Sequence, residues 1–254
     1  MARLFYIFLI AMLSPYLAFS QVWKQHRVEV NIGLPITHFF GDIGGSSTTN
    51  NALGLKDISY RSIRGGFSGG ISYRLTNKFY ARTSLFVGYF GSSDKGSVNE
   101  ARNYGFSTFG TEVSVLGQYY LIPESDQNYF YNVMQLRGGL SHINRPFSLY
   151  IFGGWGFLFY KDTPLYNLAT TDLYRFDDSQ NTALVIPFGI GIKYQILPQI
   201  LLGAELGGRY AFSDVVDGFS PAASKYNDMY YILNFNVYYR IPYQRIFKKF
   251  KWNF

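Results

Sequence analysis

Hydrophobic and polar residues alternate with a period of two over most of the chain. Around Ile32, for example, the apolar residues Val28 and Ile36 share its face, while Glu29 and Thr37 lie on the other. Such alternation is typical of a strand with one face in an apolar environment. It recurs in eight segments, and we expect strands over Arg27–Phe39, Ile63–Arg74, Phe79–Phe90, Tyr104–Leu121, Phe147–Tyr160, Thr182–Gln195, Ile200–Tyr210 and Met229–Ile241.

Three properties separate these strands from those of a soluble sandwich. They reach about ten residues or more, the length that a tilted strand needs to cross a bilayer. Their polar face is rich in Gly, Ser and Arg, and Tyr and Phe gather near their ends, as in aromatic girdles. Because every backbone group must be paired in lipid, such strands have to close on themselves. The sequence therefore predicts an all-β fold, a transmembrane antiparallel β-barrel of eight strands.

The predicted inward faces carry charges of both signs. An eight-stranded barrel has an interior just wide enough for its own side chains, so these charges are expected to pair with one another. We therefore predict a lumen charge network and no open pore. Its members are Arg64, Arg74, Arg82, Glu112, Lys193, Glu205 and Arg209, and Glu29 and Arg240 fit the same pattern.

Composition agrees with a membrane barrel. Charged residues make up 15% of the 254 residues, against about 25% in ordinary soluble domains, and aromatic residues make up 20%. The chain has no cysteine, which excludes a disulfide scaffold, a Cys-ligated zinc site and a Cys nucleophile.

Residues 1–20 are expected to be a signal peptide. Arg3 supplies the positive charge, an apolar run follows, and Ala18-Phe19-Ser20 fits the small-x-small cleavage pattern, so the mature chain would begin at Gln21. An N-terminal membrane anchor is the alternative, but Pro15 interrupts the short apolar run. An exported chain does not meet cytosolic nucleic acid, so the pI of 9.3 does not indicate such a partner. The outer membrane of a Gram-negative bacterium is the expected location.

Connection lengths set the expected orientation. An even strand count puts both termini on one side, and short turns mark the periplasmic side. Leu75–Lys78 and Ile196–Gln199 are such turns, but Ile122–Pro146 is much longer. The connections expected outside are Gly41–Ser62, Gly91–Asn103, Lys161–Asn181 and Ala211–Asp228. We divide the chain into a signal peptide (1–20), a barrel (21–241) with both termini periplasmic, and a periplasmic C-terminal tail (242–254).

The tail is basic and aromatic. Arginine and large aromatic side chains anchor protein interfaces, and the same residue types suit membrane headgroups. Both interpretations stay open, and a disordered tail without a binding function is the third alternative. The residues expected to bind a periplasmic partner are Arg245, Phe247, Lys248, Lys249, Phe250, Lys251 and Trp252.

Three segments resemble a known family. Val28–Gly45, which ends in Phe39-Phe40-Gly41-Asp42-Ile43-Gly44-Gly45, is similar to the first strand and loop of the PorG-like family, outer-membrane barrels of the type IX secretion system in Bacteroidota. Arg64–Arg82 resembles the family's second and third strands around a tight turn, and Ser148–Gly156 resembles the strand after the long periplasmic segment. The similarity covers most of the mature chain. It implies a structural role in protein transport beside a periplasmic ring of the secretion machine, with no catalytic motif to carry over.

No residue pattern indicates catalysis or a cofactor. Gly41–Gly45 lacks the spacing of a phosphate loop, and the three histidines are scattered. Two classes of lipid A-modifying barrel enzymes give a comparison. The deacylase His-x-Ser triplet does not occur, and His38 with Ser93 and Asp94 echoes the acyltransferase pattern only in reversed order. We therefore expect no enzyme, because a nucleophile needs a positioned base.

Acidic loop residues suggest one further possibility. Asp162, Asp172, Asp177 and Asp178 could hold divalent cations that bridge lipopolysaccharide, although solvated loop charge is the favoured interpretation. Outer-membrane lipid and lipopolysaccharide are in any case expected partners of a barrel. The sequence thus predicts a non-enzymatic barrel component of type IX secretion that engages periplasmic ring proteins. The alternatives are a generic small barrel for anchoring or adhesion and, after it, a lipid A-modifying barrel enzyme.

Overall fold

The computed structural model describes residues 26–40, 43–44, 62–97, 99–124, 146–170, 181–213, 216–218 and 227–242. The strands are β1 (Val28–Phe40), β2 (Arg64–Arg74), β3 (Phe79–Ser93), β4 (Tyr104–Ile122), β5 (Phe147–Tyr166), β6 (Asn181–Leu197), β7 (Ile200–Ala211) and β8 (Met229–Ile241). Two short 3-10 helices, η5 (Glu100–Arg102) and η8 (Asn167–Thr170), lie between strands. Within these ranges, no helix has the length and apolarity that a membrane crossing requires.

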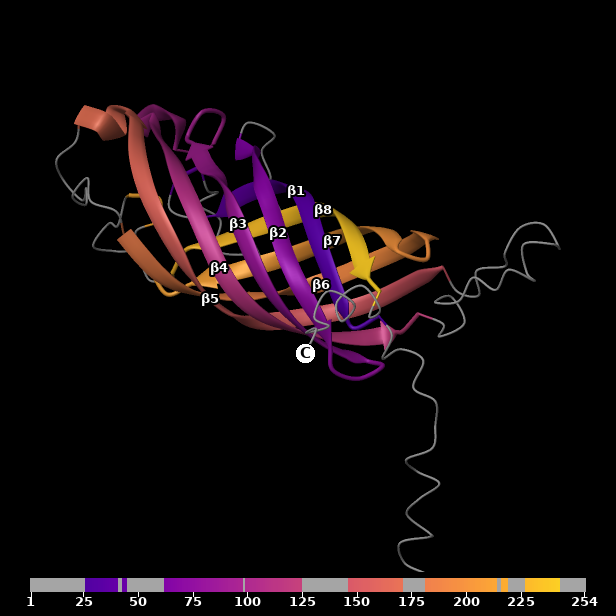
Figure 1. Cartoon of the computed structure of the whole chain (residues 1–254). Coiled ribbons are helices and arrows are strands. Elements are labelled where there is room, and N and C mark those ends of the chain that lie inside the picture. Colours follow the sequence, from indigo (N-terminus) through magenta and orange to yellow (C-terminus); the bar gives the residue numbers. More distant parts are fainter. Residues whose placement is uncertain are drawn as a thin grey trace, which may run out of the picture.

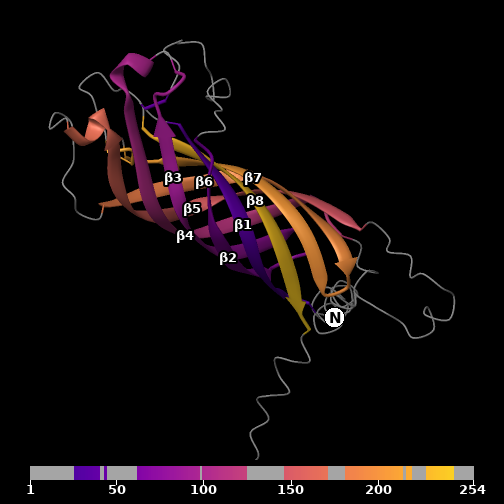
Figure 2. The same ribbon diagram turned by 90° about the horizontal axis from the view of Figure 1, so that it is seen from above.

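The eight strands form one closed barrel (Figures 1 and 2). Each strand pairs antiparallel with the next, and β1 pairs with β8 without interruption from Val28↔Ile241 to Phe40↔Met229. Closure leaves no sheet edge along the wall, which is the condition for placing strands in lipid. The predicted fold class, a closed antiparallel eight-stranded barrel, is confirmed.

Two strands run at least three residues further than the sequence pattern indicates. β3 continues beyond Phe90 to Ser93, and β5 continues beyond Tyr160 to Tyr166. Both extensions pair with the start of the long strand β4, where Tyr166 lies opposite Tyr104. The alternation stops before the strands do, because a strand that projects beyond the apolar band no longer needs an apolar outer face. The expected loop Lys161–Asn181 is therefore wrong from Lys161 to Tyr166, because these residues belong to β5.

The two ends of the barrel differ. At one end, here called the termini end, β1 begins, β8 ends, and the tight turns after β2 and β6 lie. The loop end carries the connections β1–β2, β3–β4, β5–β6 and β7–β8. The β4–β5 connection also belongs to the termini end, and only its margins, up to Glu124 and from Pro146, are described. The expected signal peptide and the tail from residue 243 onward lie outside the described residues.

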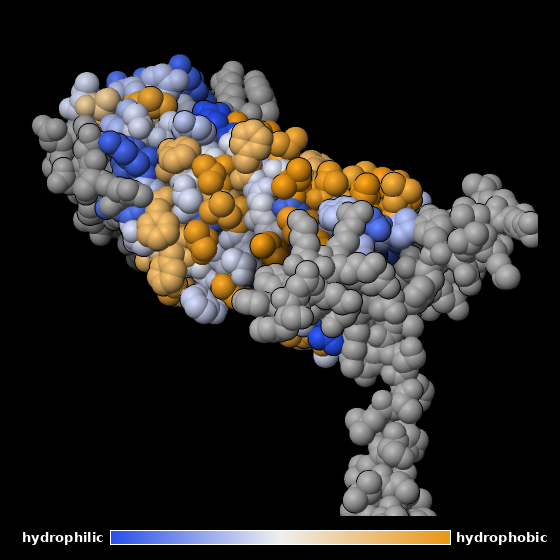
Figure 3. All heavy atoms as spheres, viewed as in Figure 1, coloured by the Kyte–Doolittle hydropathy of each residue, from blue (hydrophilic) through white to orange (hydrophobic). Residues whose placement is uncertain are grey.

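The outer wall is apolar. Ile32 is 68% exposed, Phe67 73% and Trp155 57%, and Figure 3 shows hydrophobic residues gathered across the middle of the wall. A contiguous apolar surface of this extent is unfavourable in water and stable in lipid. A closed antiparallel barrel with such a band is the architecture of outer-membrane proteins.

Candidate functional site

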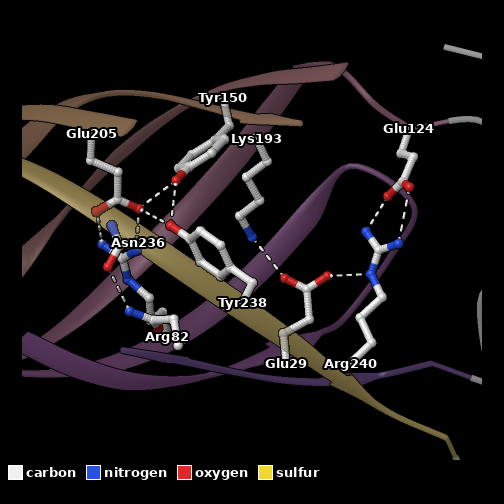
Figure 4. A network of polar contacts seen from close by, with 10 residues as sticks. Glu29, Arg82, Glu124, Tyr150, Lys193, Glu205, Asn236, Tyr238 and Arg240 are labelled. Carbon is white, nitrogen blue, oxygen red and sulfur yellow. Dashed lines mark hydrogen bonds and ion pairs between the residues drawn. The ribbon is translucent and has the colours of Figure 1, made fainter. Parts of the chain in front are cut away.

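The middle of the lumen is crossed by a buried ion pair. Arg82 on β3 and Glu205 on β7 stand four strands apart in the closed order, on opposite walls. Arg82 Nη1 contacts Glu205 Oε1, and Arg82 Nη2 donates to Oε2 at 3.1 Å. The hydroxyls of Tyr150 and Tyr238 also donate to Glu205, the latter at 2.8 Å (Figure 4). With a cation and two hydroxyl donors, this buried carboxylate is fully satisfied.

A second cluster lies toward the termini end. Glu29 accepts a hydrogen bond from Lys193 Nζ at 2.7 Å and another from Arg240 Nε at 3.0 Å. The two Nη atoms of Arg240 form a fork on the carboxylate of Glu124, with Nη1 at 2.9 Å from Oε1 (Figure 4). The side chains of Glu29, Lys193 and Arg240 are at most 2% exposed, and that of Glu124 is 5% exposed. We call these residues and the Arg82–Glu205 pair the ion-pair lattice.

Lys193 also lies among aromatic rings. Its Nζ is 4.1 Å from the ring centroid of Tyr238, 5.3 Å from Tyr150, 5.5 Å from Tyr120 and 5.7 Å from Tyr80. Ring faces attract a cation at these distances, most strongly when water is excluded. The rings therefore help to compensate the buried ammonium beyond its single carboxylate partner.

The loop-end half of the lumen is filled differently. Arg209 Nε lies 3.5 Å from Glu112 Oε2, and the Tyr230 hydroxyl donates to the same carboxylate at 2.8 Å. Beyond this pair the filling is mainly apolar, and we call its apolar part the aromatic cluster. Its buried members are Phe39, Ile43, Phe86, Phe90, Phe106, Leu158, Tyr160, Leu168, Ala183, Val185, Ala211, Val216, Tyr230 and Ile232.

Three members of the aromatic cluster come from connections rather than strands. Ile43 follows β1, Leu168 belongs to η8 after β5, and Val216 follows β7, and all are essentially unexposed. Next to them, Asp94 accepts bonds from Gly44 N at 2.9 Å and from Arg102 Nε at 2.8 Å. These contacts hold the described parts of the loops against the loop-end half of the lumen.

The structure brings most of the predicted lumen residues together. Arg82, Glu205, Lys193, Glu112 and Arg209 lie in the buried contacts described above. The other two lie near the two margins of the lumen. Arg74 bonds to Asn77 and lies over the ring of Tyr80, while Arg64 donates to the carbonyl oxygen of Ile63 at 2.9 Å. The predicted partner-binding residues of the tail lie outside the described residues.

The sequence analysis missed two features of the lumen. Glu124 was counted as part of a connection, although it continues the even-numbered inward positions of β4. The inward aromatic residues, such as Tyr150 and Phe90, were also overlooked because both faces of their strands are apolar.

The remaining candidate residues do not form a site. His38 lies on the outer face against Phe40, with ring centroids 4.6 Å apart. His26 precedes β1, and burial together with the guanidiniums of Arg240 and Arg74 lowers its pKa. Asp162 belongs to β5, and the other acidic loop positions, 172, 177 and 178, are not described. In the described part of the chain, no group of three or more His, Asp or Glu residues could hold a metal ion.

Comparison with known proteins places the chain in a family. A family model described as "Domain of unknown function (DUF6089)" matches residues 3–242. The chain belongs to the DUF6089 family. The sequence matches none of the curated proteins with which it was compared.

Several solved outer-membrane barrels are similar to this DUF6089 protein. Ail of Yersinia pestis is 12% identical, with a TM-score of 0.44, over 85% of this chain and 99% of that one. The N-terminal β-barrel domain of OprF from Pseudomonas aeruginosa is 13% identical, with a TM-score of 0.42, over 85% of this chain and 100% of that one. Neisserial surface protein A is 13% identical, with a TM-score of 0.41, over 84% of this chain and 97% of that one. No statement about function follows from similarity at this level.

The chain's own geometry gives its location. In a closed barrel with an apolar outer wall, the backbone hydrogen bonds along the wall are made between strands, so the barrel is stable in lipid. Bacterial barrels of this kind reside in the outer membrane of Gram-negative cells. This DUF6089 protein is therefore a small outer-membrane β-barrel.

Proposed function

We propose that the protein is a non-enzymatic barrel component of a type IX protein secretion machine, with its termini end in the periplasm. It engages periplasmic ring proteins through segments at that end, and its wall contacts outer-membrane lipid and lipopolysaccharide. The resemblance of Val28–Gly45, Arg64–Arg82 and Ser148–Gly156 to the PorG-like family supports this role.

The observation that carries the proposal is the filled lumen. The Arg82–Glu205 pair crosses the lumen from wall to wall, and the aromatic cluster occupies the half beyond it. A barrel without a passage acts through its ends. The protein therefore serves as an anchor for binding surfaces rather than as a pore.

The termini end carries chain that a barrel does not need. Residues 125–145 join two adjacent strands for which a short turn would suffice, and residues 243–254 follow the last strand. The latter contain Arg245, Lys248 and Trp252, which are residue types that anchor protein interfaces. The positive charges also accelerate the encounter with an acidic partner. These additions support a partner on the periplasmic side.

A second candidate function is adhesion or anchoring through the loop end. The specific observation in its favour is the folded cap, in which Asp94 ties Gly44 to Arg102. A cap held by such contacts offers a preformed surface to an external partner.

Co-purification distinguishes the two candidates. The full chain, a chain that ends at Pro242 and a loop-end control, Lys161→Glu at an exposed position of β5, are extracted from the outer membrane in detergent. Mass spectrometry then identifies the proteins that accompany each. We expect the chain ending at Pro242 to form a heat-modifiable barrel that loses the ring proteins, while Lys161→Glu retains them. Retention of every partner by the truncated chain contradicts the proposal. Loss of partners only on loop-end substitution supports adhesion.

A further inference from the structure

We propose that Arg240 is a carboxylate-binding site for an acidic residue of the periplasmic partner, and that Glu124 occupies this site when the partner is absent. The inference rests on the proposed function and makes it more specific. It names the contact through which the partner reaches the barrel itself, in addition to the tail.

Arg240 is built to hold a carboxylate. Its side chain is 2% exposed, its Nε is committed to Glu29 at 3.0 Å, and its two Nη atoms point in parallel at Glu124 (Figure 4). This fork recognises the planar geometry of a carboxylate and adds directional specificity to the charge. Its backbone N–H is bonded to Gln199 O at 2.8 Å, so the guanidinium extends from a fixed point of the wall.

Glu124 differs from the other carboxylates of the lumen ion pairs. Glu29, Glu112 and Glu205 stand on strands, whereas Glu124 lies two residues beyond the end of β4. β4 and β8 occupy opposite positions of the closed barrel, so Glu124 reaches Arg240 across the lumen mouth. A residue outside the sheet can leave without breaking a ladder of backbone hydrogen bonds. Glu124 is thus the exchangeable partner of Arg240.

The charge balance requires that another carboxylate replace Glu124 when Glu124 leaves Arg240. The buried charged side chains at the termini-end half, within the described residues, are four cations and three carboxylates: Arg74, Arg82, Lys193, Arg240, Glu29, Glu124 and Glu205. Removal of Glu124 alone takes from the buried Nη atoms of Arg240 the carboxylate that they hold, which is strongly unfavourable. An incoming carboxylate restores the balance. The geometry therefore favours an exchange of one carboxylate for another.

The chemistry of the partner follows from this site. It presents an Asp or Glu side chain, or a C-terminal carboxylate, on a segment narrow enough to enter the mouth of an eight-stranded barrel. The tail begins two residues after Arg240, and its basic residues attract acidic segments to the same end of the barrel.

The test measures binding of a fluorescently labelled hexaglutamate peptide to the full-length protein in detergent. In Glu124→Gln the neutral amide competes weakly for Arg240, and we expect the dissociation constant to fall at least about tenfold relative to the wild type. In Glu124→Gln/Arg240→Gln we expect this gain to disappear. Heat-modifiable migration confirms that each variant is an assembled barrel.

A matched control separates the site from net charge. Glu100→Gln removes one negative charge at an exposed position of the loop end and should leave the dissociation constant unchanged. The inference is overturned if Glu124→Gln binds the peptide no better than the wild type, or if the double variant retains the gain. This assay contains no secretion proteins. If the site behaves as expected but the chain ending at Pro242 retains every partner, the proposed function fails while the carboxylate site stands.

Discussion

The two halves of the lumen fill the same width of barrel with opposite chemistry. Toward the termini end, Glu29, Lys193, Arg240 and Glu124 form buried ion pairs, and Arg82–Glu205 crosses the middle. Toward the loop end the filling is aromatic and aliphatic, with one ion pair at its base. Both halves are filled by buried side chains, but those of the ionic half depend on their charged partners.

This difference has energetic consequences. A buried ion pair contributes little net stability, because desolvation offsets most of its attraction, but loss of one partner is costly. An apolar cluster loses stability in proportion to the volume removed. The stability of the termini-end half therefore depends on particular carboxylates, whereas the stability of the loop-end half depends mainly on packing. A site that responds to a partner belongs in the first half.

The largest expected effect is on the ion-pair lattice. Arg82→Leu leaves Glu205 buried without its cation, and we expect it to lower the free energy of unfolding by about 3–5 kcal/mol. Urea titration of the barrel in lipid vesicles, followed by tryptophan fluorescence, measures the change. Arg82→Leu/Glu205→Leu removes both charges and should recover a large part of the loss. A single variant within about 1 kcal/mol of the wild type contradicts the comparison.

A smaller effect is expected in the aromatic cluster. Leu158 is unexposed among rings, and Leu158→Ala should cost about 2–3 kcal/mol, the lower part of the range for such deletions, because the rings can shift into the space. The same titration gives the value. A cost that exceeds that of Arg82→Leu would reverse the proposed order of the two halves.

The smallest effect concerns pH at the termini end. The pKa of His26 is lowered by burial and by Arg240 and Arg74, so the folded protein favours the neutral ring. The unfolded chain then binds more protons below its own pKa of about 6.5, and stability falls as pH decreases through that value. Urea titrations at several pH values above and below it should show this decline. His26→Asn should flatten it, and an unchanged slope in that variant would assign the dependence to other groups.

Much of the fold could be predicted from the sequence because lipid imposes a simple rule. Most outward positions of a membrane strand are apolar, so alternation located all eight strands and both faces. The rule is silent about the inward face, where Phe90 and Tyr150 are as acceptable as Ser148. The apolar filling of the loop-end half was therefore not visible in the pattern.

The candidate site could be predicted only in part for a related reason. Charges on strands, such as Arg82 and Glu205, are assigned to the lumen by their parity. Glu124 lies beyond its strand, where the local pattern does not indicate a direction. The one indication is that the even-numbered residues of β4 face inward, and Glu124 continues that series. Its partner Arg240 is 116 positions away in the sequence, so their contact depends on closure of the barrel.

The central claim is that the lumen is sealed by two different halves and that the protein works through its termini end. Planar-bilayer recording tests the seal most directly. The account predicts no steady conductance from the wild type, from Arg82→Leu or from Phe90→Ala, because one intact half suffices to exclude water. Steady, large currents from homogeneous wild-type protein would contradict the account.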